Sequence, residues 1–114
     1  MGLLKRAPPA PKSLSPEAAA FWGRLLPACV KLRSVRSEDL QTFELMCIAL
    51  STEREARRRL DQEGMTVPSG AGTAKGHPCL RVAETARAQA LTLLGQFGLT
   101  PVALQAAPEW KDDP

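Results

Sequence analysis

The sequence predicts a small all-α protein built around a helical hairpin. Apolar residues recur every three or four positions in long stretches, and Ser-Pro and Thr-Pro pairs mark helix starts. Glycines cluster between residues 64 and 76, where the two arms of the hairpin would meet. With 114 residues, 44% of them hydrophobic, the chain is sized for one domain. Because only 4% are aromatic, we expect self-association to add buried surface.

The beginning of the sequence predicts an arm followed by a short N-terminal helix. Residues 1–14 contain three prolines among basic and small residues, which favours a flexible, basic, proline-rich arm because proline lacks the N–H that helices need. A helix should begin at Ser15, whose capping hydroxyl precedes Pro16 and Glu17. Pro27 either ends this helix or kinks it.

A long helix is predicted over residues 38–62. Ser37 precedes two acids suited to a first turn, and neither glycine nor proline occurs before Gly64. Residues 45–50 are apolar on every side of this helix. Such a helix needs partners all round, and in so short a chain we expect other copies of the chain to supply them. The interface candidates on this helix are Phe43, Met46, Cys47 and Leu50.

The glycine-rich segment predicts a loop or loose hairpin before a second long helix. This helix, 78–97, should start at His77-Pro78 and stop at Gly98. Its alanines permit close helix approach. Further interface candidates are Ala86, Ala90 and Leu94.

Thr100-Pro101 predicts a short C-terminal helix, which an acidic tail follows. The predicted organisation is therefore an arm (1–14), a helical oligomerisation and DNA-engaging domain (15–106) and a tail (107–114). Within the domain, helices 38–62 and 78–97 should pair antiparallel.

Basic residues are concentrated in the first third of the chain. The net charge is +3, yet residues 1–36 carry seven basic side chains and one acid. This asymmetry favours a polyanionic partner for the basic part and a protein partner for the mildly acidic remainder. The DNA-binding candidates are Lys31, Arg33 and Arg36 between the first two helices, and Arg54, Arg57 and Arg58 in the long helix. For Lys31, Arg33 and Arg36, a plain basic linker is an equally good interpretation.

Two interpretations of the arginines in the long helix stay open. The i,i+4 spacing of opposite charges that is typical of a solvated helix face occurs four times, in the pairs Glu53–Arg57, Glu55–Arg59, Arg57–Asp61 and Arg59–Glu63. Arg54 has no acid three or four residues away. An external anion such as a phosphate explains Arg54 better than internal pairing does.

The sequence contains no recognisable catalytic or metal-binding motif. His77 and the three cysteines, Cys29, Cys47 and Cys79, lack the spacing of a zinc site. A phosphate-cradling glycine loop, an H-E-x-x-H motif and a clear pair of catalytic carboxylates are absent. We therefore expect no enzyme activity, no cofactor and no metal.

The same composition bears on location. No apolar run approaches the roughly 20 residues of a membrane span, so no membrane partner is expected. An odd number of cysteines without a secretory leader predicts free thiols in a reducing cytoplasm rather than secretion.

Taken together, several of these features resemble the small terminase subunits of tailed phages and prophages. They are the Phe21-Trp22 helix, Glu38-Asp39-Leu40, the glycine-rich connector, His77-Pro78 and the signature Phe97-Gly98-Leu99-Thr100-Pro101. The resemblance covers roughly residues 8–105. It implies a ring of identical helical subunits in the cytoplasm of the bacterial host. Such a ring engages double-stranded viral DNA and delivers it to the large ATPase-nuclease subunit for packaging.

Two other classes of protein remain open. A dimeric helix-turn-helix transcriptional regulator would bind its operator several kcal/mol more tightly than random DNA, whereas a packaging ring would discriminate less. A structural adaptor whose basic arm binds an acidic protein would not be displaced by nucleic acid.

Overall fold

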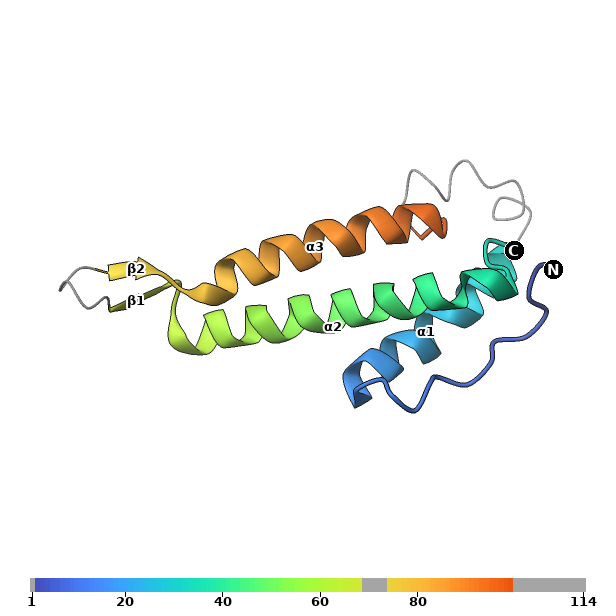
Figure 1. Ribbon diagram of the computed structural model, residues 1–114, viewed down its shortest axis with the longest axis horizontal. Helices are drawn as coiled ribbons and strands as arrows, with labels where there is room; N and C mark the ends of the chain where they lie inside the picture. The colour runs from blue at the N-terminus through green and yellow to red at the C-terminus, as the bar shows by residue number, and fades with distance from the viewer. Residues whose placement is uncertain (1, 69–73, 100–114) are drawn as a thin grey trace.

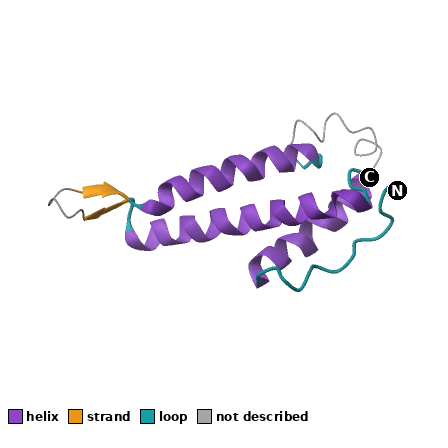
Figure 2. Cartoon of the chain, in the orientation of Figure 1, coloured by secondary structure: helices purple, strands orange, loops and turns teal. Residues whose placement is uncertain are grey.

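The protein is mostly helical, as the computed structural model shows for residues 2–68 and 74–99 (Figure 1). The helices are α1 (Pro16–Leu32), α2 (Leu40–Glu63) and α3 (Pro78–Gln96), with a 3-10 turn at Ser37–Asp39 and two short strands, β1 (Thr66–Pro68) and β2 (Ala74–Gly76). α2 and α3 run side by side in opposite directions, and α1 packs along α2 (Figures 1 and 2). The predicted helical hairpin is confirmed, whereas the short C-terminal helix lies outside the described residues.

Capping residues explain where α1 and α3 begin. The Ser15 hydroxyl accepts a hydrogen bond from the Ala18 N–H at 3.2 Å, and Pro16 is the first helical residue. At the start of α3, the Nδ1 atom of His77 accepts a hydrogen bond from the Cys79 N–H at 3.0 Å. Both starts follow from local sequence, as predicted.

The turn between α1 and α2 is tighter than the sequence indicates. α1 continues past Pro27 to Leu32, so Pro27 does not end the helix. Arg33 then adopts a left-handed backbone with φ of 58°. α2 begins at Leu40 rather than residue 38, because a 3-10 turn comes first and the Asp39 carboxylate accepts a hydrogen bond from the Arg36 N–H at 3.0 Å.

The connector between α2 and α3 is a small β-ribbon. Gly64, with φ of 86°, ends α2. β1 and β2 then pair antiparallel, with Thr66 opposite Gly76, and the ribbon extends beyond the ends of the two helices (Figure 2). The sequence predicted a loop or loose hairpin here, and the structure assigns the second of these.

Phe43 occupies the centre of the hydrophobic core, where all three helices meet. Its side chain is 0% exposed. The ring makes edge-on contacts with Trp22 of α1, at a centroid distance of 5.5 Å, and with Phe97 after α3, at 5.1 Å. The other fully buried core side chains are Leu26, Cys29, Val35, Met46 and Cys47.

This core corrects part of the predicted oligomer interface. Phe43, Met46 and Cys47 are each 0% exposed within a single chain, so they cannot line a surface between subunits. These side chains are covered by α1 and α3 of the same chain, whereas the sequence predicted that other copies of the chain would cover them. Of the remaining candidates, Ala86 and Ala90 are also buried, whereas Leu50 and Leu94 are partly buried against the core.

The N-terminal arm is extended but packed against the helices. The Leu4 N–H donates to the Val35 carbonyl at 3.1 Å, and Leu3 pairs with Arg36 in an antiparallel bridge. Further along, the Trp22 indole N–H donates to the Pro8 carbonyl at 2.9 Å. The arm therefore contacts the rest of the chain at Leu3, Leu4 and Pro8.

The described helices include none that is both long enough and apolar enough to cross a membrane.

The three cysteines are free thiols in two different environments. Burial raises the pKa of the Cys29 thiol to about 11 and that of Cys47 to about 12, so both stay protonated at neutral pH. Cys79, in the first turn of α3, is partly exposed.

We expect a disulfide reagent at pH 8 to modify one thiol per native chain, Cys79, in a fast phase. Cys29 and Cys47 should react only as the chain unfolds, because their sulfurs are inaccessible and protonated. The check is the absorbance of the released thiolate, with Cys79→Ser as the control variant. A fast phase that persists in Cys79→Ser would contradict the assignment.

Candidate functional site

Five basic residues gather where α1 turns into α2. Lys31 is in the last turn of α1, Arg33 and Arg36 follow it, and all three are exposed. The pairing of Leu3 and Leu4 with Arg36 and Val35 brings the next two residues of the arm, Lys5 and Arg6, to the same end of the molecule. We call this group the basic turn: Lys5, Arg6, Lys31, Arg33 and Arg36. Only Glu38 and Asp39 bring negative charge into this part of the sequence.

Lys5 and Arg6 belong to the basic turn, although the sequence did not single them out from the other basic residues of the first third. They lie about 30 positions before Arg36, and the sequence assigns them to a free arm. A bridge between backbone segments so far apart leaves no signal in local spacing. The tertiary structure alone places these cations beside the predicted ones.

Further along α2, three of the four arginines are paired with carboxylates. Arg57 contacts Glu53 at 2.9 Å and Arg59 contacts Glu63 at 3.3 Å, as the spacing predicts. The other two predicted pairs are replaced by different partners: Glu55 contacts Arg58 at 2.7 Å rather than Arg59, and Arg57 contacts Glu53 rather than Asp61. These exposed ion pairs contribute little to stability, but they neutralise charge that a phosphate would otherwise meet.

Arg58 also joins two helices. Its guanidinium lies 2.8 Å from the carboxylate of Glu17 in the first turn of α1. Arg58 is paired with two carboxylates of its own chain, and Arg57 is paired with one. The structure therefore gives both of these predicted DNA-binding residues a role inside the subunit.

Arg54 is arranged differently from its neighbours. Its guanidinium carbon lies 4.7 Å from the centroid of the Phe21 ring in α1, and that of Arg24 lies 5.1 Å from the same centroid. Among the described residues, neither arginine contacts a carboxylate. A depression of about 520 Å³ borders both side chains. Arg54 stands out in the sequence but Arg24 does not, because only the packing of α1 on α2 brings the two together.

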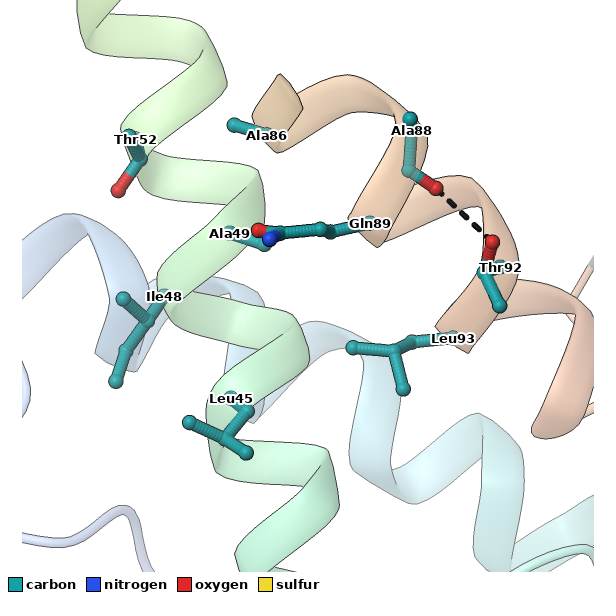
Figure 3. A pocket seen from close by; sticks show the side chains of 9 residues that line it. All are labelled: Leu45, Ile48, Ala49, Thr52, Ala86, Ala88, Gln89, Thr92 and Leu93. Atoms are coloured by element: carbon teal, nitrogen blue, oxygen red, sulfur yellow. Dashed lines mark hydrogen bonds between the residues drawn. The ribbon is translucent and has the colours of Figure 1, made fainter. Parts of the chain in front are cut away.

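A second surface feature is an apolar groove between α2 and α3 (Figure 3). It has a volume of about 600 Å³. Leu45 is 57% exposed and Ile48 is 40% exposed, and Gln89 reaches across from α3 toward α2. The lining residues are Leu45, Ile48, Ala49, Thr52, Ala86, Ala88, Gln89, Thr92 and Leu93. The apolar stretch 45–50 thus has one face in the core and another in this groove.

His77 ties the far ends of α2 and α3 together. Because its Nδ1 accepts the Cys79 N–H, the ring proton lies on Nε2, which donates to the Glu63 carboxylate at 2.9 Å. The ring is buried. Within the ranges 2–68 and 74–99, no cluster of three His, Cys, Asp or Glu side chains is suited to a metal ion, and the structure gives His77 a role as a helix cap.

The Glu63 contact predicts a pH dependence of stability. Hydrogen bonds from His77 and then Arg59 hold the pKa of the Glu63 carboxyl below its ordinary value of 4.5. The folded state therefore favours the carboxylate, so the contribution is present above pH 4.5 and is lost as the pH falls through the lower folded value. We expect Glu63→Gln to unfold at a lower temperature than the wild type at pH 7, and the difference between the two to be smaller at pH 3. A difference in melting temperature that is the same at both pH values would contradict this.

Comparison with known proteins identifies the family. The family model described as "Phage terminase, small subunit" matches residues 18–113. The chain belongs to the phage terminase small subunit family. This membership supports a role in phage DNA packaging. No curated protein and no solved structure matches the chain.

In this terminase small subunit, the predicted DNA-binding residues fall into separate groups. Lys31, Arg33 and Arg36 lie in the basic turn, and Arg54 lies about four helical turns from the start of α2, or about 20 Å by the rise of an α-helix. The structure does not bring these two groups into contact within one subunit. A polyanion that touches both must therefore extend along α1 and α2.

Proposed function

We propose that this terminase small subunit is the non-catalytic, DNA-engaging component of a packaging machine. Several copies form a ring, hold double-stranded viral DNA and deliver it to the large ATPase-nuclease subunit in the cytoplasm of the bacterial host. The observation that carries the proposal is the family match over residues 18–113. The distribution of charge and of exposed apolar surface supports its two parts.

The basic turn supports the DNA-binding part. Five cations lie at one end of the molecule, contributed by the arm, by α1 and by the connection to α2. Such a group attracts phosphates without reading bases, and its affinity falls steeply with salt because bound counterions are released. A contact of this kind retains DNA without fixing one register, which suits a component that holds DNA while it moves.

The groove between α2 and α3 supports the ring. Leu45 and Ile48 expose large apolar side chains on a hairpin whose distal half is covered by charged residues. An apolar patch of this kind is typical of a protein contact surface. A ring requires that one face of a subunit bind a different face of the next, and the side of a long helical hairpin can provide this head-to-tail contact. We therefore assign the groove to the neighbouring subunit.

The experiment that tests the proposal is the native mass of the protein, measured by light scattering after size exclusion at low and high salt. We expect an assembly of several chains that survives high salt, and binding of duplex DNA that weakens as salt is added. A mass of 12.3 kDa at both salt concentrations, the value for one chain, would overturn the ring. A dimer with a strong preference for one DNA sequence would favour the helix-turn-helix regulator instead.

A further inference from the structure

Two arginines from different helices share one aromatic ring. Phe21 is 6% exposed, and its ring forms part of the core. Arg24 follows it by one turn on α1, and Arg54 reaches it from α2. Since both guanidinium carbons lie near the same centroid, their separation cannot exceed the sum of the two distances of 5.1 and 4.7 Å. The two cations are therefore neighbours in space.

The carboxylate that borders the depression is already paired with another arginine. Glu17 borders the same depression, but its carboxylate is held by Arg58 at 2.8 Å. Arg58 in turn also contacts Glu55. Two like charges close together repel each other, and the aromatic ring offsets only part of that cost. An anion placed between them would remove the repulsion.

We propose that Arg24 and Arg54 form a preorganised site for one phosphodiester group of the DNA backbone, with Phe21 as its platform. This inference rests on the proposed DNA-binding function and adds a contact distinct from the basic turn. A phosphodiester carries one negative charge and presents two free oxygens, which match the forked N–H donors of guanidinium groups. The depression of about 520 Å³, bordered by Pro16 and Ala20, leaves room for such a group.

The platform explains why these two arginines suit the task. A long side chain in water loses conformational freedom when it binds, and that loss reduces affinity. Stacking on Phe21 restricts Arg24 and Arg54 before DNA arrives, so less freedom remains to be lost. The site contacts the backbone rather than base edges, so it positions DNA without selecting sequence. Together with the basic turn, it would hold the duplex at two places, which are separated by about 20 Å from the start of α2 to Arg54 and by about 10 Å from Lys31 to Arg24 along α1.

The test is the binding of a labelled duplex by fluorescence anisotropy over a range of salt concentrations. Arg24→Gln combined with Arg54→Gln should reduce the slope of log affinity against log salt by about one, because one phosphate contact is lost. The same double variant should weaken binding at low salt by roughly tenfold. The matched control is Arg81→Gln combined with Arg87→Gln, two exposed arginines of α3, which removes the same charge. The control should retain the wild-type slope.

A third variant separates charge from geometry. Arg54→Lys keeps the positive charge but loses the forked donors and the planar stack, so its affinity should lie between those of the wild type and Arg54→Gln. Wild-type affinity and slope in the Arg24/Arg54 double variant would overturn the inference while leaving the proposed function in place. Equal losses of affinity in the Arg24/Arg54 variant and the Arg81/Arg87 control would also overturn the inference and leave the proposed function in place. Failure of the wild type to bind duplex DNA would overturn both.

Discussion

Replacing Phe43 by alanine is expected to lower the free energy of unfolding by about 3–5 kcal/mol. The side chain is fully buried and meets Trp22 and Phe97 edge-on, so one truncation removes contacts among all three helices. Removing the ring leaves a cavity that the packed helices can close only in part. In so small a chain, a loss of this size is a large share of the total stability. Urea unfolding followed by circular dichroism in the far ultraviolet measures it.

Two further variants show whether the effect comes from the core contact. Phe43→Leu keeps an apolar group at the site and should lose clearly less stability than the alanine variant. Leu91→Ala removes an apolar side chain that is 52% exposed, and should change the free energy of unfolding by no more than about 0.5 kcal/mol. A Phe43→Ala variant whose unfolding free energy stays within about 1 kcal/mol of the wild type would mean that the three helices do not pack around this ring.

Replacing both Leu45 and Ile48 by aspartate is expected to separate the proposed ring into single chains. The groove is apolar, and docking a neighbouring subunit would strip water from two carboxylates without providing partners for them. The penalty recurs at every interface of a ring, so the effect on assembly is large. Light scattering should show the mass of one chain, 12.3 kDa, at a concentration where we expect the wild type to form the proposed ring.

The matched control for this variant is Leu91→Asp, an exposed leucine of α3 that does not line the groove. It should retain the wild-type mass. Circular dichroism should show intact helices in all the aspartate variants, because the replaced side chains contribute little to the core. Wild-type mass in the Leu45/Ile48 variant would show that the subunits contact each other through a different surface.

Several helix boundaries and two local charge pairs could be predicted from the sequence. The start at Ser15-Pro16, the cap at His77-Pro78 and the stop at Gly64 depend on a few consecutive residues. The same is true of the Glu53–Arg57 and Arg59–Glu63 pairs, whose partners lie one turn apart. These features follow from backbone chemistry and helix periodicity, which act over short stretches of chain.

Which face of the long helix is buried could not be predicted in the same way. Residues 45–50 are apolar all round, so periodicity alone does not distinguish Met46 in the core from Leu45 in the groove. That choice depends on where α1 and α3 pack. The helices that surround α2, and therefore its buried face, are decided only when the chain folds.

The sequence by itself determined the helical class, the places where α1 and α3 begin, the excess of positive charge in the first third and the family. Only the tertiary structure placed Lys5 and Arg6 beside Arg36, paired Arg58 with Glu17, and set Arg24 and Arg54 on one ring. The physical reason is the range of the interactions. Caps and helix periodicity act between residues a few positions apart, whereas these contacts join residues about 30 to 40 positions apart that meet only when the helices pack.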